Sequence, residues 1–533
     1  MQRAVAPPYP ELRRTRHLRT RPRPVYCPIG ADRQDPAVAD DALAGRFTCA
    51  GSTLATGVPP DWQRAGLADD EEWHIEWSKF YYGLDLAHAF ETTGDRRYLN
   101  TWVTLVSSWI DQRRPDADTS DVTARRLQNW LYAWQILDRA PGFPGLHPLF
   151  ERRLLTSITD QLAHVRHTLS PERNHRTLEL YALLVLPLGL PSLDPDGSGT
   201  AWAWAALQQN LLADVWADGV HRERSTHYHL IALRSFLAAR VNARRFGLIV
   251  PDAYDVRLRA ACRFGMHLHR PDGQIPALSD SDSGSHLDLL LLAADSFDDP
   301  ALRYVATYGR EGTAPTERCV EFPVAGYQVQ RSGWGDRGEA FGDERFLVLG
   351  CGPLGDGGHG HYDALSVEAY AHGHPLVVDP GRYTYAEGSP NWRHWFKGTA
   401  AHNTVTVDGL DQQPYRRGKP KGPQLACRLL AREGTDGLHL LRGEVRSPAY
   451  DAVHRREVLF VDDAYWLVLD TLRAPGPHDY ELRWHLAPGP GLTVDHGAAA
   501  SRTRTASVTV ETAGGQRAVV EEGWVSVLYG VRS

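Results

Sequence analysis

The sequence lacks three features, and each absence excludes a class of protein. Its six cysteines are scattered and include no C-x-x-C pair, which argues against a disulfide framework and against a cysteine-based metal site. No apolar run approaches the length of a membrane span. The formal net charge is -7, so the chain as a whole lacks the positive charge typical of nucleic-acid binders. We therefore expect no nucleic-acid partner and no membrane.

The segment 1–25 is basic and rich in proline, but it lacks the apolar stretch of a secretory signal peptide. On this ground we expect a cytoplasmic protein, with export left open if the true start lies upstream. The sequence also leaves the oligomeric state open, a homodimer included.

With 533 residues, 42% hydrophobic and 23% charged, the chain has the composition of a globular protein with two or more large domains. Residues 1–60 carry no regular pattern, and we expect an irregular N-terminal arm there. Over residues 61–315, apolar residues recur at helical spacing. The pattern begins near Glu71, where EEWHIEWSKFYYGLDLAHAF places Trp73 and Trp77 on one helix face. This predicts an all-α domain of antiparallel helix pairs.

From about residue 316 the apolar period changes to the alternation of strands. Segments such as RFLVLGCG, HNTVTVDG and REVLFVDDAYWLVLDTL are short and are bounded by glycine, aspartate or proline. This pattern is typical of an antiparallel β-sandwich, which we expect over residues 316–533. The fold class is thus predicted to be α+β and multidomain, with the active cleft between the two domains.

Two histidines and an aspartate lie next to expected strands of the second domain. Asp379 follows the strand Pro375 to Val378, His402 opens HNTVTV, and His361 precedes an alternating run. Imidazole nitrogens and a carboxylate suit zinc, so we predict one structural zinc ion bound by these three residues. His359 would then be free for chemistry. The alternative is that these are separate polar residues at strand ends that bind no metal.

The run GDGGHGHYDALS, followed by LVVDPG and TAAHNTV, resembles the β-domain core of the heparinase II/III-like polysaccharide lyases, a group similar to some alginate lyases. Arg173-Asn174-His175, Asp218-Gly219 and ERSTHYH at residues 223–229 extend the resemblance upstream. It implies that the helical domain is an incomplete (α/α) toroid. It also implies a polysaccharide or oligosaccharide lyase that cleaves an anionic, uronate-containing glycan by β-elimination and leaves an unsaturated uronate end.

Such an elimination needs a group that neutralises the C6 carboxylate, a base for the C5 proton and an acid for the departing O4. For the carboxylate, the resemblance implies Asn174 and His175. They stand at the start of an expected helix, where backbone N–H groups favour an anion. The alternative for Asn174 is that it serves only as the helix N-cap.

For proton transfer, the resemblance implies Tyr228, with His359 as the second group. An unperturbed tyrosine has a pKa of about 10, so a basic role requires positive neighbours that stabilise the phenolate. Arg224, one helical turn earlier, is the expected source of that charge. Without the resemblance, Tyr228 would be interpreted as a half-buried helix tyrosine.

We expect further substrate contacts from arginines, an amide and a carboxylate near these groups, namely Arg125, Arg126, Asn129, Arg224 and Asp280. Two other functions stay open. A glycoside hydrolase on an (α/α) toroid would need two carboxylic acids flanking the bond, and no such pair accompanies Tyr228 and His359. A non-catalytic carbohydrate-binding protein of polysaccharide biosynthesis would need none of these reactive groups, so the lyase ranks first.

Overall fold

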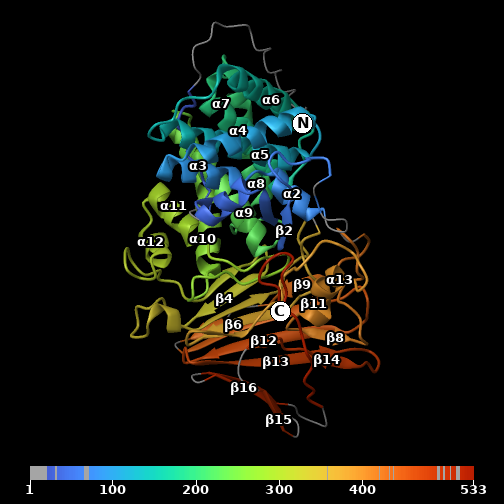
Figure 1. Cartoon of the computed structure of the whole chain (residues 1–533). Coiled ribbons are helices and arrows are strands. Elements are labelled where there is room, and N and C mark those ends of the chain that lie inside the picture. Colours follow the sequence, from blue (N-terminus) through green and yellow to red (C-terminus); the bar gives the residue numbers. More distant parts are fainter. Residues whose placement is uncertain are drawn as a thin grey trace. The chain divides into compact units, whose positions relative to one another are not determined.

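The computed structural model describes residues 21–29, 33–64, 66, 71–356, 358–418, 421–430, 433–435, 437–488, 492–495, 498–503, 506–511 and 517–533. The chain forms two compact units, coloured by sequence in Figure 1. Unit 1 comprises Met1–Asp214 and Arg234–Asp255, and unit 2 comprises Val215–Leu233 and Val256–Ser533.

Unit 1 opens with regular structure inside the region where we expected an irregular arm. Helix α1 (Pro36–Leu43) is followed by a hairpin of β1 (Arg46–Cys49) and β2 (Ser52–Ala55). The helix begins at a proline, and the side chain of Asp35 accepts a hydrogen bond from the Ala37 N–H. Both features favour the start of a helix, which explains why this short segment is helical.

The body of unit 1 is helical (Figure 1). Its helices are α2 (Glu72–Ser78), α3 (Tyr82–Thr93), α4 (Arg96–Gln112), α5 (Ser120–Arg139), α6 (Pro148–His167), α7 (Arg173–Gly189) and α8 (Ser198–Asp214), with a 3₁₀ turn η2 (Pro191–Leu193). α5 packs against both α3 and α7, whereas α4 packs against α6. α7 is buried on every side from Thr177 to Gly189, as expected for a helix inside a helical layer.

The expected single helix from Glu71 through the apolar run is interrupted. The chain breaks between α2 and α3 at Phe80, whose φ is 61°. A positive φ is incompatible with a continuing right-handed helix, so the apolar spacing persists across two helices instead of one.

Two helices contribute residues to both units. α9 (Thr226–Arg245) begins in unit 2 and ends in unit 1, and α10 (Asp252–Leu268) begins in unit 1 and ends in unit 2. Unit 2 also contains α11 (Leu287–Phe297) and α12 (Pro300–Ala306). The change from helices to strands lies between Ala306 and the first strand of the next sheet.

Unit 2 is built mainly on antiparallel sheets. One has the order β3-β4-β5-β6-β7, and the other has the order β10-β11-β12-β13 with β9 paired to β11. Their strands are β3 (Val320–Phe322), β4 (Tyr327–Arg331), β5 (Phe346–Gly350), β6 (Val367–Ala371), β7 (His374–Val377), β9 (Ala426–Leu429), β10 (Glu433–Thr435), β11 (Leu438–Arg446), β12 (Val453–Val461) and β13 (Tyr465–Arg473). The smaller sheets contain β8 (Val405–Val407), β14 (Tyr480–Leu482), β15 (Leu492–Asp495), β16 (Ala498–Arg502) and β17 (Ser507–Glu511). Short helical turns are η3 (Phe341–Asp343), α13 (Trp392–Lys397) and η4 (Thr399–Ala401).

Successive side chains of β5 point to opposite faces of its sheet, so this strand contributes to two hydrophobic cores. Leu347 and Leu349 pack with residues of β11 and β12, so the two large sheets share one apolar core. Phe346 and Val348 point to the opposite face, where they join Phe264 of α10. The sheet β3–β7 is therefore buried on both faces, which fixes the loops at its ends.

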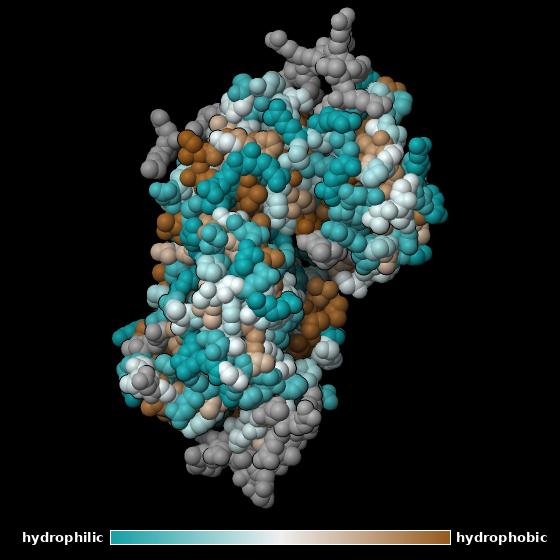
Figure 2. All heavy atoms as spheres, turned by 90° about the vertical axis from the view of Figure 1, so that its left-hand side faces the viewer, coloured by the Kyte–Doolittle hydropathy of each residue, from teal (hydrophilic) through white to brown (hydrophobic). Residues whose placement is uncertain are grey.

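Unit 2 thus confirms the predicted antiparallel β architecture, and unit 1 confirms the predicted helical one. The face of the molecule seen in Figure 2 is largely hydrophilic, with hydrophobic residues in separate groups. Among the described residues, no helix combines the length and apolar character needed to cross a membrane.

Candidate active site

Tyr228 lies in the first turn of α9, and local capping fixes its position. The Tyr228 N–H donates to Oγ of Ser225 at 3.2 Å, and the His227 N–H donates to Oγ of Ser281 at 3.1 Å. These two hydroxyls satisfy N–H groups that lack partners within the helix. The start of α9 is thereby attached to the loop that carries Asp280.

A second tyrosine completes a hydroxyl pair. The hydroxyl oxygens of Tyr228 and Tyr385 are 2.7 Å apart. Arg382 donates to both, at 2.8 Å to Tyr385 and at 3.4 Å to Tyr228. The guanidinium is itself held by Asp282 through two hydrogen bonds of 2.8 and 2.6 Å, so its position is fixed.

His359 lies against the ring of Tyr228. The two rings are stacked, with centroids 4.0 Å apart and planes 29° apart. Nδ1 of His359 is 2.9 Å from Oδ2 of Asp280. An ionised carboxylate can only accept, so in the neutral imidazole Nδ1 carries the proton and Nε2 keeps its lone pair. The side chain is 17% exposed, which leaves this imidazole accessible as a proton acceptor.

Asp280 is the residue around which this part of the site is assembled. Its side chain is fully buried, and Oδ1 is 2.8 Å from Nε2 of His361. Arg393 contacts both carboxylate oxygens. Burial opposes ionisation, but Arg393 and the two histidines outweigh it and hold the pKa of Asp280 well below its ordinary value.

This burial corrects the expectation that Asp280 contacts substrate. No surface of its carboxylate is exposed, and its oxygens already accept from His359, His361 and Arg393. Asp280 is therefore a positioning residue, which fixes the nitrogen of His359 that carries the proton.

The expectation for Arg224 is also wrong. Arg224 precedes α9 and has a φ of 54°, so helical spacing does not bring its side chain to Tyr228. Its guanidinium instead donates to the Pro353 carbonyl and lies 4.7 Å from the Tyr327 ring centroid. The cation beside Tyr228 is Arg382.

The protonation state of Tyr228 follows from its surroundings. Burial, followed by the neighbouring Tyr385, raises the pKa of Tyr228 well above its ordinary value, and Arg382 offsets this only in part. The phenol therefore holds its proton at neutral pH. This arrangement suits a proton donor, beside an imidazole that suits a proton acceptor.

The three predicted metal ligands come together. One ligand atom from each of His361, Asp379 and His402 lies within 4.8 Å of the others, and all three side chains are buried. His361 donates from Nε2 to Asp280, and His402 donates from Nδ1 to Oδ2 of Asp379 at 2.9 Å. Among the described residues, Nδ1 of His361 and Nε2 of His402 have no hydrogen-bond partner.

In its neutral form, each of these imidazoles therefore keeps one lone pair unused while a carboxylate fixes its other nitrogen. Metal-binding histidines in proteins usually have this arrangement. Two nitrogen donors and one carboxylate fit a metal ion, and the geometry is that of a candidate metal site.

The predicted carboxylate-binding residues lie in unit 1. Asn174 is the second residue of α7 and is 3% exposed, whereas His175 is exposed. The N-cap position belongs to Glu172, so the alternative reading of Asn174 as the N-cap is wrong. Asn174 lies in the first turn, where backbone N–H groups lack intrahelical partners.

The residues of α5 that we predicted to contact substrate differ in their burial and in their hydrogen-bond partners. Arg126 is fully buried and forms a 2.6 Å ion pair with Asp118, so it compensates a core charge and cannot reach a substrate. Arg125 is 6% exposed and donates to Gln128 at 2.9 Å. Asn129 donates to the carbonyl of Lys79 at 2.8 Å. Roles for Arg125 and Asn129 stay predictions.

Four residues of this constellation escaped the sequence reasoning, namely Arg382, Tyr385, Arg393 and Asp282. Arg382 and Tyr385 lie in DPGRYTY, directly after the predicted ligand Asp379. An arginine and a tyrosine next to an expected ligand were the available signal, but only the fold shows that they meet Tyr228.

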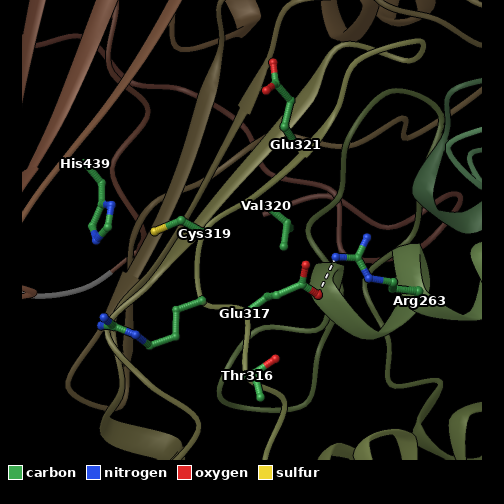
Figure 3. Close-up of a pocket in the computed structure, with 8 residues that line it drawn as sticks. Arg263, Thr316, Glu317, Cys319, Val320, Glu321 and His439 are labelled. Atoms are coloured by element: carbon green, nitrogen blue, oxygen red, sulfur yellow. Dashed lines mark hydrogen bonds and ion pairs between the residues drawn. The ribbon is translucent and has the colours of Figure 1, made fainter. Parts of the chain in front are cut away.

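A cavity of about 600 Å³ lies elsewhere in unit 2 and is lined by Arg263, Thr316, Glu317, Arg318, Cys319, Val320, Glu321 and His439. Figure 3 shows the carboxylate of Glu317 turned toward Arg263, with which it forms a 2.5 Å ion pair. Arg318 pairs with Asp463. Because its arginines are compensated and none of the reactive groups lines it, this cavity is separate from the candidate site.

Comparison with known proteins agrees with these findings. The profile of the "Heparinase II/III N-terminus" matches residues 9–298, and that of "Heparinase II/III-like, C-terminal" matches residues 314–533. The chain is 24% identical over 449 residues to a heparin-sulfate lyase of Pedobacter heparinus, covering 81% of this chain and 64% of that protein. A heparin-sulfate lyase of Bacteroides stercoris is 24% identical over 501 residues, covering 86% and 71%.

A crystal structure of heparinase III superposes with a TM-score of 0.81 at 20% identity, covering 98% of this chain and 84% of that one. Heparan sulfate lyase from Pedobacter heparinus superposes with a TM-score of 0.66 at 23% identity, covering 95% and 79%. These structures share the fold. Because the two profiles together match nearly the whole sequence, the chain belongs to the heparinase II/III-like family.

Proposed function

We propose that the protein is a polysaccharide lyase that cleaves an anionic, uronate-containing glycan by β-elimination. The observation that carries this proposal is the stack of Tyr228 on His359, with ring centroids 4.0 Å apart. It places a phenol that holds its proton beside an imidazole whose Nε2 holds a lone pair. Elimination needs one group of each kind on the reacting sugar.

In the proposed reaction, Nε2 of His359 removes the C5 proton, and the C5–H electron pair becomes the C4–C5 double bond. The C4–O4 bond breaks, and O4 takes the proton of Tyr228. The resulting phenolate is stabilised by the Tyr385 hydroxyl and by Arg382, which lie 2.7 and 3.4 Å from the phenol oxygen. Water can later restore the two protonation states, so the enzyme is unchanged.

The C6 carboxylate must be neutralised before its neighbouring proton becomes acidic enough to remove. We assign this task to Asn174 and His175, in the first turn of α7. An amide side chain and the positive end of the helix dipole stabilise an anion at such a position.

The relatives named heparin-sulfate lyases support a glycosaminoglycan as the substrate class. The chain spans 64% of the length of the Pedobacter heparinus relative, so we propose the chemistry and the anionic glycan without its particular sulfation. The packing of α5 on α3 and α7, with α4 on α6, supports an incomplete (α/α) toroid in unit 1.

The most informative experiment incubates the protein with a panel of uronate polymers and follows ultraviolet absorbance from an unsaturated C4–C5 product. We expect absorbance and new chain ends in equal amounts on at least one polymer. New reducing ends without absorbance would instead identify hydrolysis.

The structure gives a specific reason to rank hydrolysis lower. It requires one carboxylic acid that keeps its proton and a second carboxylate across the bond. Of the described carboxyl groups near Tyr228, Asp280 is held ionised by Arg393, and Asp282 accepts two hydrogen bonds from Arg382. Both carboxyl groups are thus engaged within the protein.

We also infer that His361, Asp379 and His402 hold one zinc ion, because two imidazole nitrogens and a carboxylate suit that metal. When bound, the ion would cross-link the segments that carry these ligands and brace His361 against Asp280. Elemental analysis should find close to one equivalent of zinc, and chelation should lower the melting temperature. Less than a tenth of an equivalent of any transition metal would contradict the inference.

A further inference from the structure

Helix α13 presents two different faces. Arg393 and Lys397, four residues apart, are buried, with Arg393 on Asp280 and Lys397 donating to the Gly358 carbonyl at 2.6 Å. Trp392 and Trp395, three residues apart, are only half-buried. The helix therefore supports the catalytic groups with one face and shows indole rings on the other.

The C-terminal segment adds a third indole ring. Residues 525–533 fold back on themselves through two backbone hydrogen bonds between Val525 and Ser533, of 3.1 and 2.9 Å. The Ser526 N–H donates to the Pro380 carbonyl, and the Gly530 N–H donates to the Tyr383 carbonyl, each at 2.8 Å. This C-terminal hairpin is thus attached to the segment that carries Arg382 and Tyr385. It is preceded by Trp524, which is 39% exposed.

Arg532, from the same hairpin, lies among these rings. Its guanidinium carbon is 3.7 Å from the Trp392 centroid, 4.7 Å from Trp524 and 5.0 Å from Tyr383. The two indoles meet edge to face, with centroids 5.7 Å apart. We call Trp392, Trp524 and Arg532 the aromatic platform.

No acid among the described residues compensates the charge of this arginine. No ion pair of Arg532 occurs within the described part of the chain, and its buried Nη1 has no hydrogen-bond acceptor there. Stacking on rings favours a cation but leaves its N–H groups unused. Guanidinium N–H groups in this state bind carboxylates or sulfates well, since the planar fork matches their geometry.

We propose that the aromatic platform is a subsite for an anionic sugar unit of the glycan chain that Tyr228 and His359 cleave. One face of a pyranose ring consists of C–H groups and packs on an indole, while a carboxylate or sulfate of the same unit pairs with Arg532. This proposal rests on the proposed function. α13 carries Trp392 of the platform and also Arg393, which holds Asp280, so the subsite takes a sugar unit beyond the one that reacts.

The test uses the full chain and uronate oligosaccharides of increasing length. Trp524→Ala and Arg532→Gln should raise KM for long substrates about tenfold, the usual order for a lost charged hydrogen bond or stacking contact, with kcat unchanged. The shortest substrate that is cleaved should be unaffected. The matched control is Tyr480→Ala on β14, which removes a ring that is 40% exposed and leaves the platform intact.

Equal KM for wild type and Arg532→Gln at every length would overturn the proposal, as would a lower melting temperature without any length-dependent change. Oligosaccharides with reduced carboxyl groups, or without sulfate, identify which anion Arg532 binds.

Calorimetric binding of the same oligosaccharides separates this proposal from the lyase assignment. If no polymer yields an unsaturated product, the lyase assignment fails. Binding that is lost in Arg532→Gln but kept in Tyr480→Ala would still support the subsite, and unchanged binding in both would exclude it.

Discussion

Two pairs of hydrogen-bonded tyrosines differ in their surroundings, and the difference distinguishes a packing role from a catalytic one. In unit 1, the hydroxyls of Tyr132 and Tyr181 are 3.1 Å apart, and Asn242 donates to Tyr181 at 3.1 Å. Both rings are at most 1% exposed. In unit 2, Tyr228 and Tyr385 are half-buried and share a cation, Arg382.

Burial raises the pKa of all four phenols, so protonation state alone does not distinguish the pairs. The difference lies in what surrounds them. The pair in unit 2 has an accessible imidazole stacked on one ring and a guanidinium ready to stabilise a phenolate. The pair in unit 1 has neutral partners and no access to substrate, which identifies it as a packing feature.

The largest effect is expected from Tyr228→Phe. The ring keeps its stack on His359, so the melting temperature should hardly change, but O4 loses its proton donor. Turnover should fall by more than ~10²-fold on every substrate, as for the loss of a general acid. Initial rates followed by ultraviolet absorbance measure it. Retention of more than about a tenth of the wild-type rate on any substrate would mean that Tyr228, like the tyrosines of the unit 1 pair, has a packing role and is not the proton donor.

A similar but more selective loss is expected from His359→Gln, since only the unit 2 pair has an imidazole beside it. Where the C5 proton faces the histidine, turnover should fall by roughly 10²-fold, with KM little changed. A panel containing both C5 epimers measures this selectivity. Normal turnover on both epimers would show that the stacked imidazole is not the base.

A smaller effect is expected from Tyr385→Phe, which removes the second hydroxyl and leaves Arg382 in place. Turnover should fall about tenfold, because one hydrogen bond to the charged phenolate, of about 1.5 kcal/mol, is lost. The ratio of kcat values under saturating substrate provides the measurement. A loss as large as that of Tyr228→Phe would instead mean that both hydroxyls transfer protons.

The smallest effect on catalysis is expected from Tyr181→Phe in unit 1. It leaves the Tyr132 hydroxyl without its acceptor and removes one of the two hydrogen bonds donated by the Asn242 amide, which should lower the free energy of unfolding by about 1–3 kcal/mol. Denaturant titration measures that loss, while turnover per folded molecule should equal wild type. Reduced turnover at normal stability would show that the unit 1 pair also contributes to catalysis, and the two pairs would then not differ in role.

The sequence predicted what depends on local pattern. Helical spacing in unit 1, strand alternation in unit 2 and the clustering of His361, Asp379 and His402 could all be identified in advance. Prediction from the sequence failed where a residue with a positive φ turns the backbone and interrupts the helical spacing of side chains. The positive φ of Phe80 splits an expected helix, and that of Arg224 turns its side chain away from Tyr228.

Long-range pairing was beyond sequence reasoning. Tyr385 and Arg382 lie 157 and 154 residues from Tyr228, and Asp280 lies 79 residues from His359. Nothing in the local pattern of either segment encodes these contacts. They depend on the packing of α10 and the sheet β3–β7 around a shared core.

The path of the chain between the two units has a consequence for its synthesis. Unit 1 needs residues 234–255, which emerge only after Val215–Leu233 of unit 2. On the ribosome, the segment with Tyr228 therefore appears before unit 1 is complete, and its partners Arg382 and Tyr385 follow much later. No single cut of the polypeptide can yield both units whole, so a fragment beginning at residue 316 would carry His359 without the tyrosine on which it stacks.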